Sequence, residues 1–266
     1  LAPDDPDVRA AARVILHERE QAQEGKGPEV TGGRAESGTS RKEAPTKILF
    51  LEPKGLTRFL DDLVAKLADK DAFEVKHRRI GSTSDPMPID WADIVWLEWA
   101  NELAVHLTRN KPLLRKKKVI CRLHRYEAFR DYPGDIDWEV VDCLLFVSDH
   151  VRSVFQKRFP GCEVNTRVIH NGLDVGEFDI SPAEQKEEKA AFLAHLRHAK
   201  NVPLLVQIAS ELKLRESDVR IHVGGDWWSV EDKEYFEFCR EKNGLQQHLV
   251  YDGWIEDVNE WLGAKR

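Results

Sequence analysis

The amino-acid sequence predicts an α/β protein built from two parallel sheets. Short, continuously apolar segments alternate with amphipathic segments along residues 47–169. This alternation is typical of strands buried on both faces beneath layers of helices. A polar stretch over 179–188 separates this set from a second, shorter one with about three strands. Three strands are fewer than a sheet usually carries, so we expect the second sheet to be incomplete in this chain.

The first set contains six predicted strands, over 47–52, 73–80, 94–97, 118–123, 143–147 and 164–169. Three amphipathic helices are expected between them, over 56–68, 100–108 and 148–159. The first of these carries Phe59, Leu60, Leu63 and Leu67 on one face, at helical spacing. Ser148 stands where a helix N-cap is expected.

The second set begins with a predicted buried strand over 190–194, followed by a polar loop. A helix is expected to open near Asn201, since Leu204, Leu205, Ile208 and Leu212 recur at helical spacing. A strand over 219–223, a helix over 230–242 and a strand over 248–251 follow, and a further helix begins near 256–258.

The first 46 residues lack the pattern of either sheet. Residues 1–23 predict a helix with a narrow apolar stripe, and residues 24–46 predict a flexible linker because they are almost devoid of apolar side chains. The sequence begins with Leu1 and not with Met, so we expect it to be an excerpt of a longer protein. Additional domains in that longer protein stay open.

Composition excludes several classes of protein. The chain has 266 residues and a formal net charge of −7, which argues against a general nucleic-acid binder. No apolar run reaches the length of a membrane span, so we expect a cytoplasmic protein and leave peripheral membrane contact open. The four cysteines show no CxxC spacing and predict buried, reduced thiols; no metal-ligand cluster is apparent.

A basic loop follows the predicted strand over 190–194 and leads into the next helix. It contains His195, Lys200 and Asn201. The amides and the dipole of a helix N-terminus favour an anion, and a lysine adds a full charge, so the loop is suited to phosphate. A solvated connection that is merely basic would account for the same residues.

Several motifs occur in the order found in one enzyme family. Residues 171–174 read Asn-Gly-Leu-Asp and are followed by Phe178; residues 192–201 contain a Leu-x-x-x-Lys-Asn sequence; residues 223–225 read Val-Gly-Gly; and residues 250–253 read Val-Tyr-Asp-Gly. In order and spacing the set resembles the retaining glycosyltransferases of family four, which have the GT-B fold of two Rossmann-like domains. The resemblance assigns residues 47–180 to an acceptor domain and 181–266 to part of a donor domain.

The resemblance implies transfer of a sugar from a nucleotide-diphosphate-sugar donor to a hydroxyl acceptor, with retention of anomeric configuration. The donor is a substrate and no cofactor is implied; the acceptor is a glycan, a lipid or a protein. The family's later acidic motif, two glutamates separated by seven residues, does not occur before the chain stops. We therefore expect these 266 residues alone to be inactive. A non-catalytic nucleotide or sugar binding module and a sugar-nucleotide epimerase of the same fold are the alternatives.

The resemblance also assigns roles to individual residues. His124 is the catalytic candidate, at a strand end where parallel sheets place ligands. The donor phosphates are assigned to Lys200, His195, Asn201, Gly55 and Lys54, the nucleotide to Gly224, Gly225 and Trp254, and the acceptor to Glu98 and Trp99. Each assignment has a structural alternative: His124 as a hydrogen-bonded loop residue, Gly55 as part of an ordinary turn, and Trp99 as packing between sheet and helix. For Trp227 and Trp228 the two interpretations are a wall beside the nucleotide base and a cover for the sheet edge. The chain has Ala194-His195 where the family has Gly-Arg.

Overall fold

A computed structural model describes residues 44–55, 60–172, 176, 178 and 189–264. The chain divides into two compact units, residues 1–175 and 176–266. The helix expected over 1–23, nearly all of the linker expected over 24–46 and the expected boundary at 180/181 lie outside the described residues.

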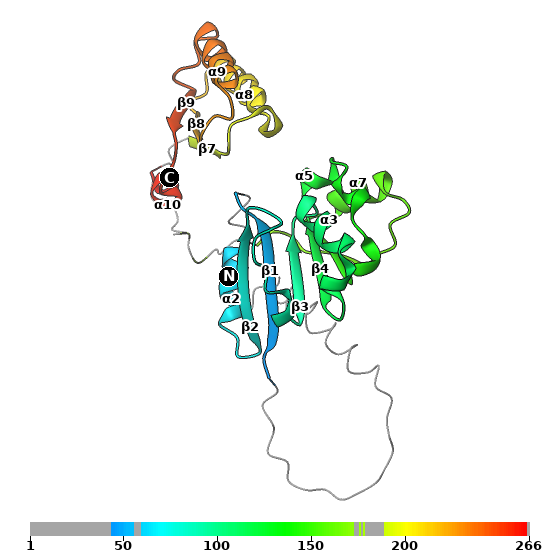
Figure 1. The fold of residues 1–266 in the computed structure, drawn as a ribbon. Helices are drawn as coiled ribbons and strands as arrows, with labels where there is room; N and C mark the ends of the chain where they lie inside the picture. The colour runs from blue at the N-terminus through cyan, green and yellow to red at the C-terminus, as the bar shows by residue number, and fades with distance from the viewer. Residues whose placement is uncertain (1–43, 56–59, 173–175, 177, 179–188, 265–266) are drawn as a thin grey trace, which may run out of the picture. The chain divides into compact units, whose positions relative to one another are not determined.

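The first unit contains one parallel sheet (Figure 1). Its strands run in the order β2-β1-β3-β4-β5-β6, and every neighbouring pair is parallel. Their bounds are β1 Thr46–Pro53, β2 Phe73–Ile80, β3 Ile94–Glu98, β4 Lys118–Leu123, β5 Cys143–Phe146 and β6 Thr166–Val168. All six strands were predicted, and only β6 is notably shorter than expected.

Helices cover both faces of this sheet. On one face, α2 (Asp61–Ala68) packs Leu60 and Leu67 against Phe50 and Trp96. On the other face pack α3 (Glu102–Arg109) and α7 (Asp149–Arg158), and Ser148 caps α7 as predicted. Three single-turn helices were not predicted, because four residues are too few to show a periodicity: α4 Lys111–Leu114, α5 Arg125–Ala128 and α6 Tyr132–Asp135.

The second unit contains the three strands that the sequence predicts, in the parallel order β7-β8-β9. They are β7 Lys189–Leu193, β8 Arg220–Gly224 and β9 Leu249–Gly253. Helices α8 (Val202–Leu214) and α9 (Val230–Lys242) follow β7 and β8 and share one apolar cluster with the sheet, and α10 spans Val258–Gly263.

The prediction of a buried strand over 190–194 is wrong. Ala190, Ala191 and Leu193 of β7 are exposed. Within the described residues β7 pairs only with β8, so it is an edge strand with little cover. The apolar composition of β7 therefore indicates that the segment forms a strand, but it does not indicate that the strand is buried.

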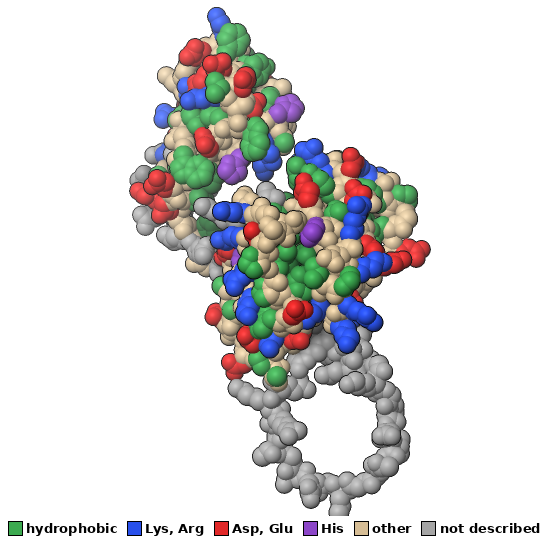
Figure 2. All heavy atoms as spheres, viewed as in Figure 1, with side chains coloured by type: hydrophobic (Ala, Val, Ile, Leu, Met, Phe, Trp, Pro, Cys, Tyr) green, Lys and Arg blue, Asp and Glu red, His purple; other side chains and the backbone are tan. Residues whose placement is uncertain are grey.

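The four cysteines are free, as expected, but only Cys121 and Cys143 are buried. Cys162 is partly exposed, and burial still raises the pKa of its thiol to about 11. On the face drawn in Figure 2, acidic and basic side chains are interspersed, in keeping with the net charge of −7.

Candidate functional site

The first unit carries a row of charged side chains along the carboxyl edge of its sheet. Strand order reverses between β1 and β3, which is where open α/β sheets bind ligands. Arg79 of β2 stands opposite Glu52 of β1, and Glu98 of β3 stands opposite Arg122 of β4. Residues directly opposite one another point to the same face. These four residues are called the carboxyl-edge row below.

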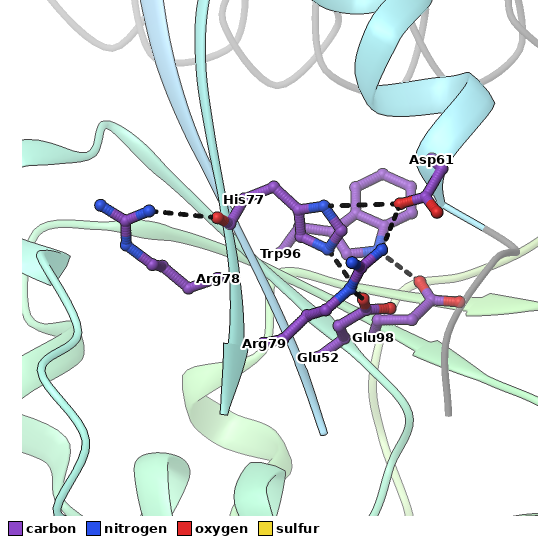
Figure 3. A network of polar contacts seen from close by, with 7 residues as sticks. All are labelled: Glu52, Asp61, His77, Arg78, Arg79, Trp96 and Glu98. Carbon is purple, nitrogen blue, oxygen red and sulfur yellow. Dashed lines mark hydrogen bonds and ion pairs between the residues drawn. The ribbon is translucent and has the colours of Figure 1, made fainter. Parts of the chain in front are cut away.

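Glu52 is one of two buried carboxylates in the row, with 1% of its surface exposed. Arg79 Nε donates to Glu52 Oε1 over 2.8 Å, and His77 Nε2 lies 3.0 Å from the same oxygen. Arg79 also binds Asp61 at the start of α2, over 2.6 Å (Figure 3). Side chains of the neighbouring strand β2 therefore compensate the charge of Glu52, and the contact between Arg79 and Asp61 connects α2 to the same cluster.

Glu98 is the other buried carboxylate, and the structure corrects the prediction that it faces an acceptor. Its side chain has no exposed surface. Trp96 Nε1 donates to Oε2 over 2.8 Å (Figure 3), His124 Nε2 lies 2.6 Å from Oε1, and Arg122 Nη1 lies 3.6 Å away. Both oxygens are thus engaged by the protein, so Glu98 holds His124 and contacts no solvent.

His124 begins α5 as its N-cap residue and is 5% exposed. Its ring stacks on Trp99 with centroids 4.1 Å apart. Trp99 is only 8% exposed, so it packs on the histidine instead of presenting a face to solvent, as the acceptor assignment would require. Trp99 also has φ +78, a left-handed conformation that is costly for a bulky residue and is most often retained at functional sites.

Glu127 was missed by the sequence analysis, although it lies beside His124. It is fully buried in α5, and its Oε1 accepts a hydrogen bond from Ala100 N over 2.9 Å. Its Oε2 has no hydrogen-bond partner within the described part of the chain. Burial raises the pKa of this carboxyl, and the charge of His124 partly offsets the rise. The signal was present: Glu127 follows the N-cap His124 by three residues, the spacing of a capping box.

The raised pKa of Glu127 predicts a pH dependence of stability. The carboxyl of the folded state keeps its proton above the ordinary value of 4.5, whereas the unfolded chain releases it there. Stability contributed by this group therefore falls as pH rises from about 4.5 through the raised pKa. Relative to the parent, Glu127→Gln should gain stability across that window, as measured by urea unfolding at a series of pH values. The exposed Glu163→Gln is the control; parallel curves for parent and Glu127→Gln would contradict the prediction.

Lys54 and Gly55 form the turn that follows β1, at the same edge as the row. Gly55 has φ +94, and no described residue beyond its chain neighbours lies within 4 Å of the position that a Cβ would occupy. The turn thus uses glycine for its backbone conformation and leaves space beside it. Residues 56–59, which come next, lie outside the described residues.

In the second unit, the basic loop lies between β7 and α8 as predicted. His195 and Lys200 are exposed, and residues 198–200 form a 3₁₀ turn. Asn201 precedes α8 with φ +56 and makes no side-chain cap to the helix. No side chain caps the amides in the first turn of α8, where Pro203 has no N–H and Leu204 N donates to the Asn201 carbonyl oxygen over 3.0 Å; cations lie just before the helix. This arrangement is chemically suited to an anion.

The glycines after β8 are explained by the close approach of two chain segments. A Cβ on Gly225 would lie 1.8 Å from the Ala194 carbonyl oxygen, and Gly225 has φ +125. A Cβ on Gly224 would lie 2.6 Å from Ile255 Cγ1. Both residues therefore let the ends of β7, β8 and β9 converge, and their assigned contact with a nucleotide stays a prediction.

The three tryptophans near this edge differ in burial. Trp227 packs in the core against Phe236, whereas Trp228 is 72% exposed beneath the guanidinium of Arg197. Trp254 is 57% exposed, and its ring centroid lies 6.3 Å from that of His195. The structure thus brings together His195 and Trp254, two residues assigned to the donor from separate segments.

The described residues contain no group of three or more His, Cys, Asp or Glu side chains placed to hold a metal ion. None of the helices in the described part of the chain has the length and apolar character needed to cross a membrane.

No protein-family model and no curated protein sequence matches the chain. Solved structures do match. HepE from Anabaena, in complex with UDP and glucose, superposes with a TM-score of 0.60 at 15% identity, over 82% of this chain and 72% of HepE. The chain has a GT-B-like fold.

Two further structures agree with this assignment. The lipopolysaccharide outer core galactosyltransferase WaaB gives a TM-score of 0.56 at 12% identity, over 83% of this chain and 71% of WaaB. A glycosyltransferase from Rickettsia africae gives 0.56 at 14% identity, over 83% and 71%. At these identities the likeness concerns the fold, so the reaction is argued from the residues.

Proposed function

We propose that this protein transfers a sugar from a nucleotide-diphosphate-sugar donor to a hydroxyl acceptor. The observation that carries the proposal is the basic loop of residues 195–201, which is exposed and leads into a helix without a side-chain cap. The GT-B-like fold supports it, because HepE was solved with UDP and glucose and WaaB is a galactosyltransferase.

The donor is bound by the second unit in this proposal. Lys200, His195 and the Val202 amide at the start of α8 hold the diphosphate, and Trp254 lies beside the nucleotide. When the sugar leaves, negative charge grows on the departing nucleoside diphosphate. Cations and amides fixed at that point stabilise the transition state more than the bound donor, and so accelerate the reaction.

In this proposal the first unit binds the acceptor and contains His124. His124 is the catalytic candidate of this unit, and Glu98 fixes the orientation of its imidazole through the 2.6 Å contact. Glu98 is thus reassigned from an acceptor contact to a positioning residue. Retention of configuration and membership of family four rest on the motif resemblance. The proposal includes a cytoplasmic location, no resident cofactor and no nucleic-acid partner.

Lys200→Ala tests the donor site. A charge-assisted hydrogen bond contributes about 1.5–3 kcal/mol, so the dissociation constant of UDP should rise about tenfold to hundredfold. The measurement is calorimetric titration of the full chain with UDP. Lys233→Ala, an exposed lysine of α9, is the matched control and should bind UDP like the parent. Equal affinity for UDP in parent and Lys200→Ala would remove the loop from the donor site.

The same substitution, made in a chain that also carries the family's acidic motif, separates the proposal from its main alternative, because these 266 residues alone are expected to be inactive. UDP-glucose is offered with a set of hydroxyl acceptors, and released UDP is measured. Release that depends on acceptor and on Lys200 supports transfer. UDP binding without any release would favour a non-catalytic binding module.

A further inference from the structure

An exposed aromatic and cationic surface follows directly after His124. Helix α5 begins at the carboxyl end of β4, and Tyr126 and Phe129 at this helix are 50% and 53% exposed. Among the described residues of the first unit, the only other large hydrophobic side chain with comparable exposure is Leu113. Exposed aromatic rings at the ligand-binding edge of a parallel sheet indicate a contact surface.

Two arginines cover these rings without ion pairs of their own. Arg130 lies over the Tyr126 ring at 4.6 Å, and Arg125 lies over the Phe129 ring at 5.6 Å. Neither guanidinium forms an ion pair within the described part of the chain. We call Arg125, Tyr126, Phe129 and Arg130 the α5 platform.

The carboxylates around the platform are otherwise engaged. Asp131 binds Arg158 over 2.9 Å, and Glu127 is buried beneath α5. Glu102 accepts a hydrogen bond from Tyr132, which raises the pKa of that phenol. The platform therefore carries two exposed positive charges, and Figure 2 shows basic side chains beside hydrophobic ones in the region of α5.

We propose that the α5 platform binds the acceptor and that this acceptor is an anionic sugar, a carbohydrate bearing a carboxylate or a phosphate. This inference rests on the proposed function and narrows its acceptor. The apolar face of a sugar ring packs on an exposed aromatic ring, which offers a large contact area at little conformational cost. The planar guanidinium matches carboxylate and phosphate oxygens in a two-pronged contact. A neutral sugar would use the rings and leave both charges without a partner.

The position of the platform favours an acceptor over an unrelated partner. Arg125 is adjacent in sequence to His124, and Glu127 connects α5 to the end of β3 through Ala100 N. A sugar held on the platform would thus be bound beside the residue proposed to act on the donor sugar. The platform is small, because it consists of two rings and two cations. It therefore matches a ligand of one or two sugar units better than it matches the broad, flat surface of a larger partner.

The test uses defined sugars as probes. The full chain is titrated with tetragalacturonate and with glucose 6-phosphate, and the neutral counterparts are galactotetraose and glucose. At least one anionic probe should bind tenfold or more tightly than its neutral counterpart, and this preference should shrink as salt is added. Equal binding of charged and neutral sugars, or no binding of either anionic probe, would overturn the proposal.

Variants assign the binding to the platform. Arg125→Gln with Arg130→Gln should lower the affinity for the anionic probe at least tenfold, and so should Tyr126→Ala with Phe129→Ala. The exposed pair Arg115→Gln with Lys116→Gln removes the same charge elsewhere and should change affinity less than twofold. Unfolding midpoints of all variants are compared, so that a folding defect is recognised. Unchanged affinity in both platform variants would overturn the proposal.

Two further readouts separate the alternatives. Vesicles of anionic phospholipid that bind through the same four residues, while the sugars do not, would assign the platform to a membrane surface and overturn the proposal. UDP titration of the same samples separates this inference from the proposed function. If the anionic sugars do not bind while UDP does, the proposal for the α5 platform alone is refuted. If the sugars bind while UDP does not, the proposal for the donor site alone is refuted.

Discussion

Replacing Glu98 with alanine is expected to lower the free energy of unfolding of the first unit by about 3–5 kcal/mol. Glu98 is buried between Trp96, His124 and Arg122. Among the described residues, its removal leaves the buried charge of Arg122 with only Asn171 as a partner, and leaves the indole N–H of Trp96 without an acceptor. Uncompensated buried charges are among the few causes of losses this large. The measurement is urea unfolding, with hydrogen exchange of amides in the first unit as the readout.

Two controls show whether the charge is responsible. Glu74→Ala removes an exposed glutamate of β2 and should change stability by less than about 0.5 kcal/mol. Glu98→Leu combined with Arg122→Met removes both charges and should recover much of the loss, because apolar replacements of a buried ion pair are often tolerated. A double variant as unstable as Glu98→Ala would show that shape, and not charge, accounts for the effect.

Gly225→Ala is expected to destabilise the second unit by about 3 kcal/mol or more. The new Cβ would lie 1.8 Å from the Ala194 carbonyl oxygen, which is backbone and cannot rotate away. The residue would also have to keep φ +125. The ends of β7 and β8 must therefore separate, and the loop of residues 195–201 moves with them. Hydrogen exchange of the second unit measures the loss, and UDP affinity should fall with it.

Gly253→Ala is the matched control for this change. Gly253 also has a positive φ, +81, but in the described part of the chain nothing beyond its neighbours lies within 4 Å of its Cβ position. Only the conformational cost remains, about 1–2 kcal/mol. If the two alanine variants were equally stable, the close approach at Gly225 would not be the constraint that the geometry indicates.

Most of the fold could be predicted from sequence because its strands are short apolar runs between amphipathic helices. The burial of β7 could not be predicted. Apolar residues such as Ala190 and Leu193 indicate a strand, but their exposure depends on how many strands lie beside it. Sheet order is likewise a property of the assembled sheet. Single-turn helices such as α5 stay hidden because one turn shows no period.

Only part of the arrangement of the candidate site follows from the sequence. His124 was predicted at a strand end, where parallel sheets place ligands, and because parallel strands end at one edge Glu98 at the end of β3 lies beside it. Their contacts depend on register, which the sequence does not show. Register places Glu98 opposite Arg122 and so buries it. Glu52 could have been noticed as a charge that ends an apolar strand.

Residues 195–201 and the turn at Trp254 are proposed to bind a nucleoside diphosphate. The most direct measurement is a titration of isotope-labelled full chain with UDP, followed through backbone amide resonances. We expect the largest shifts at Lys200, at Val202 and near Trp254, and a loss of these shifts in Lys200→Ala. Shifts confined to the first unit, or none at saturating UDP, would contradict it.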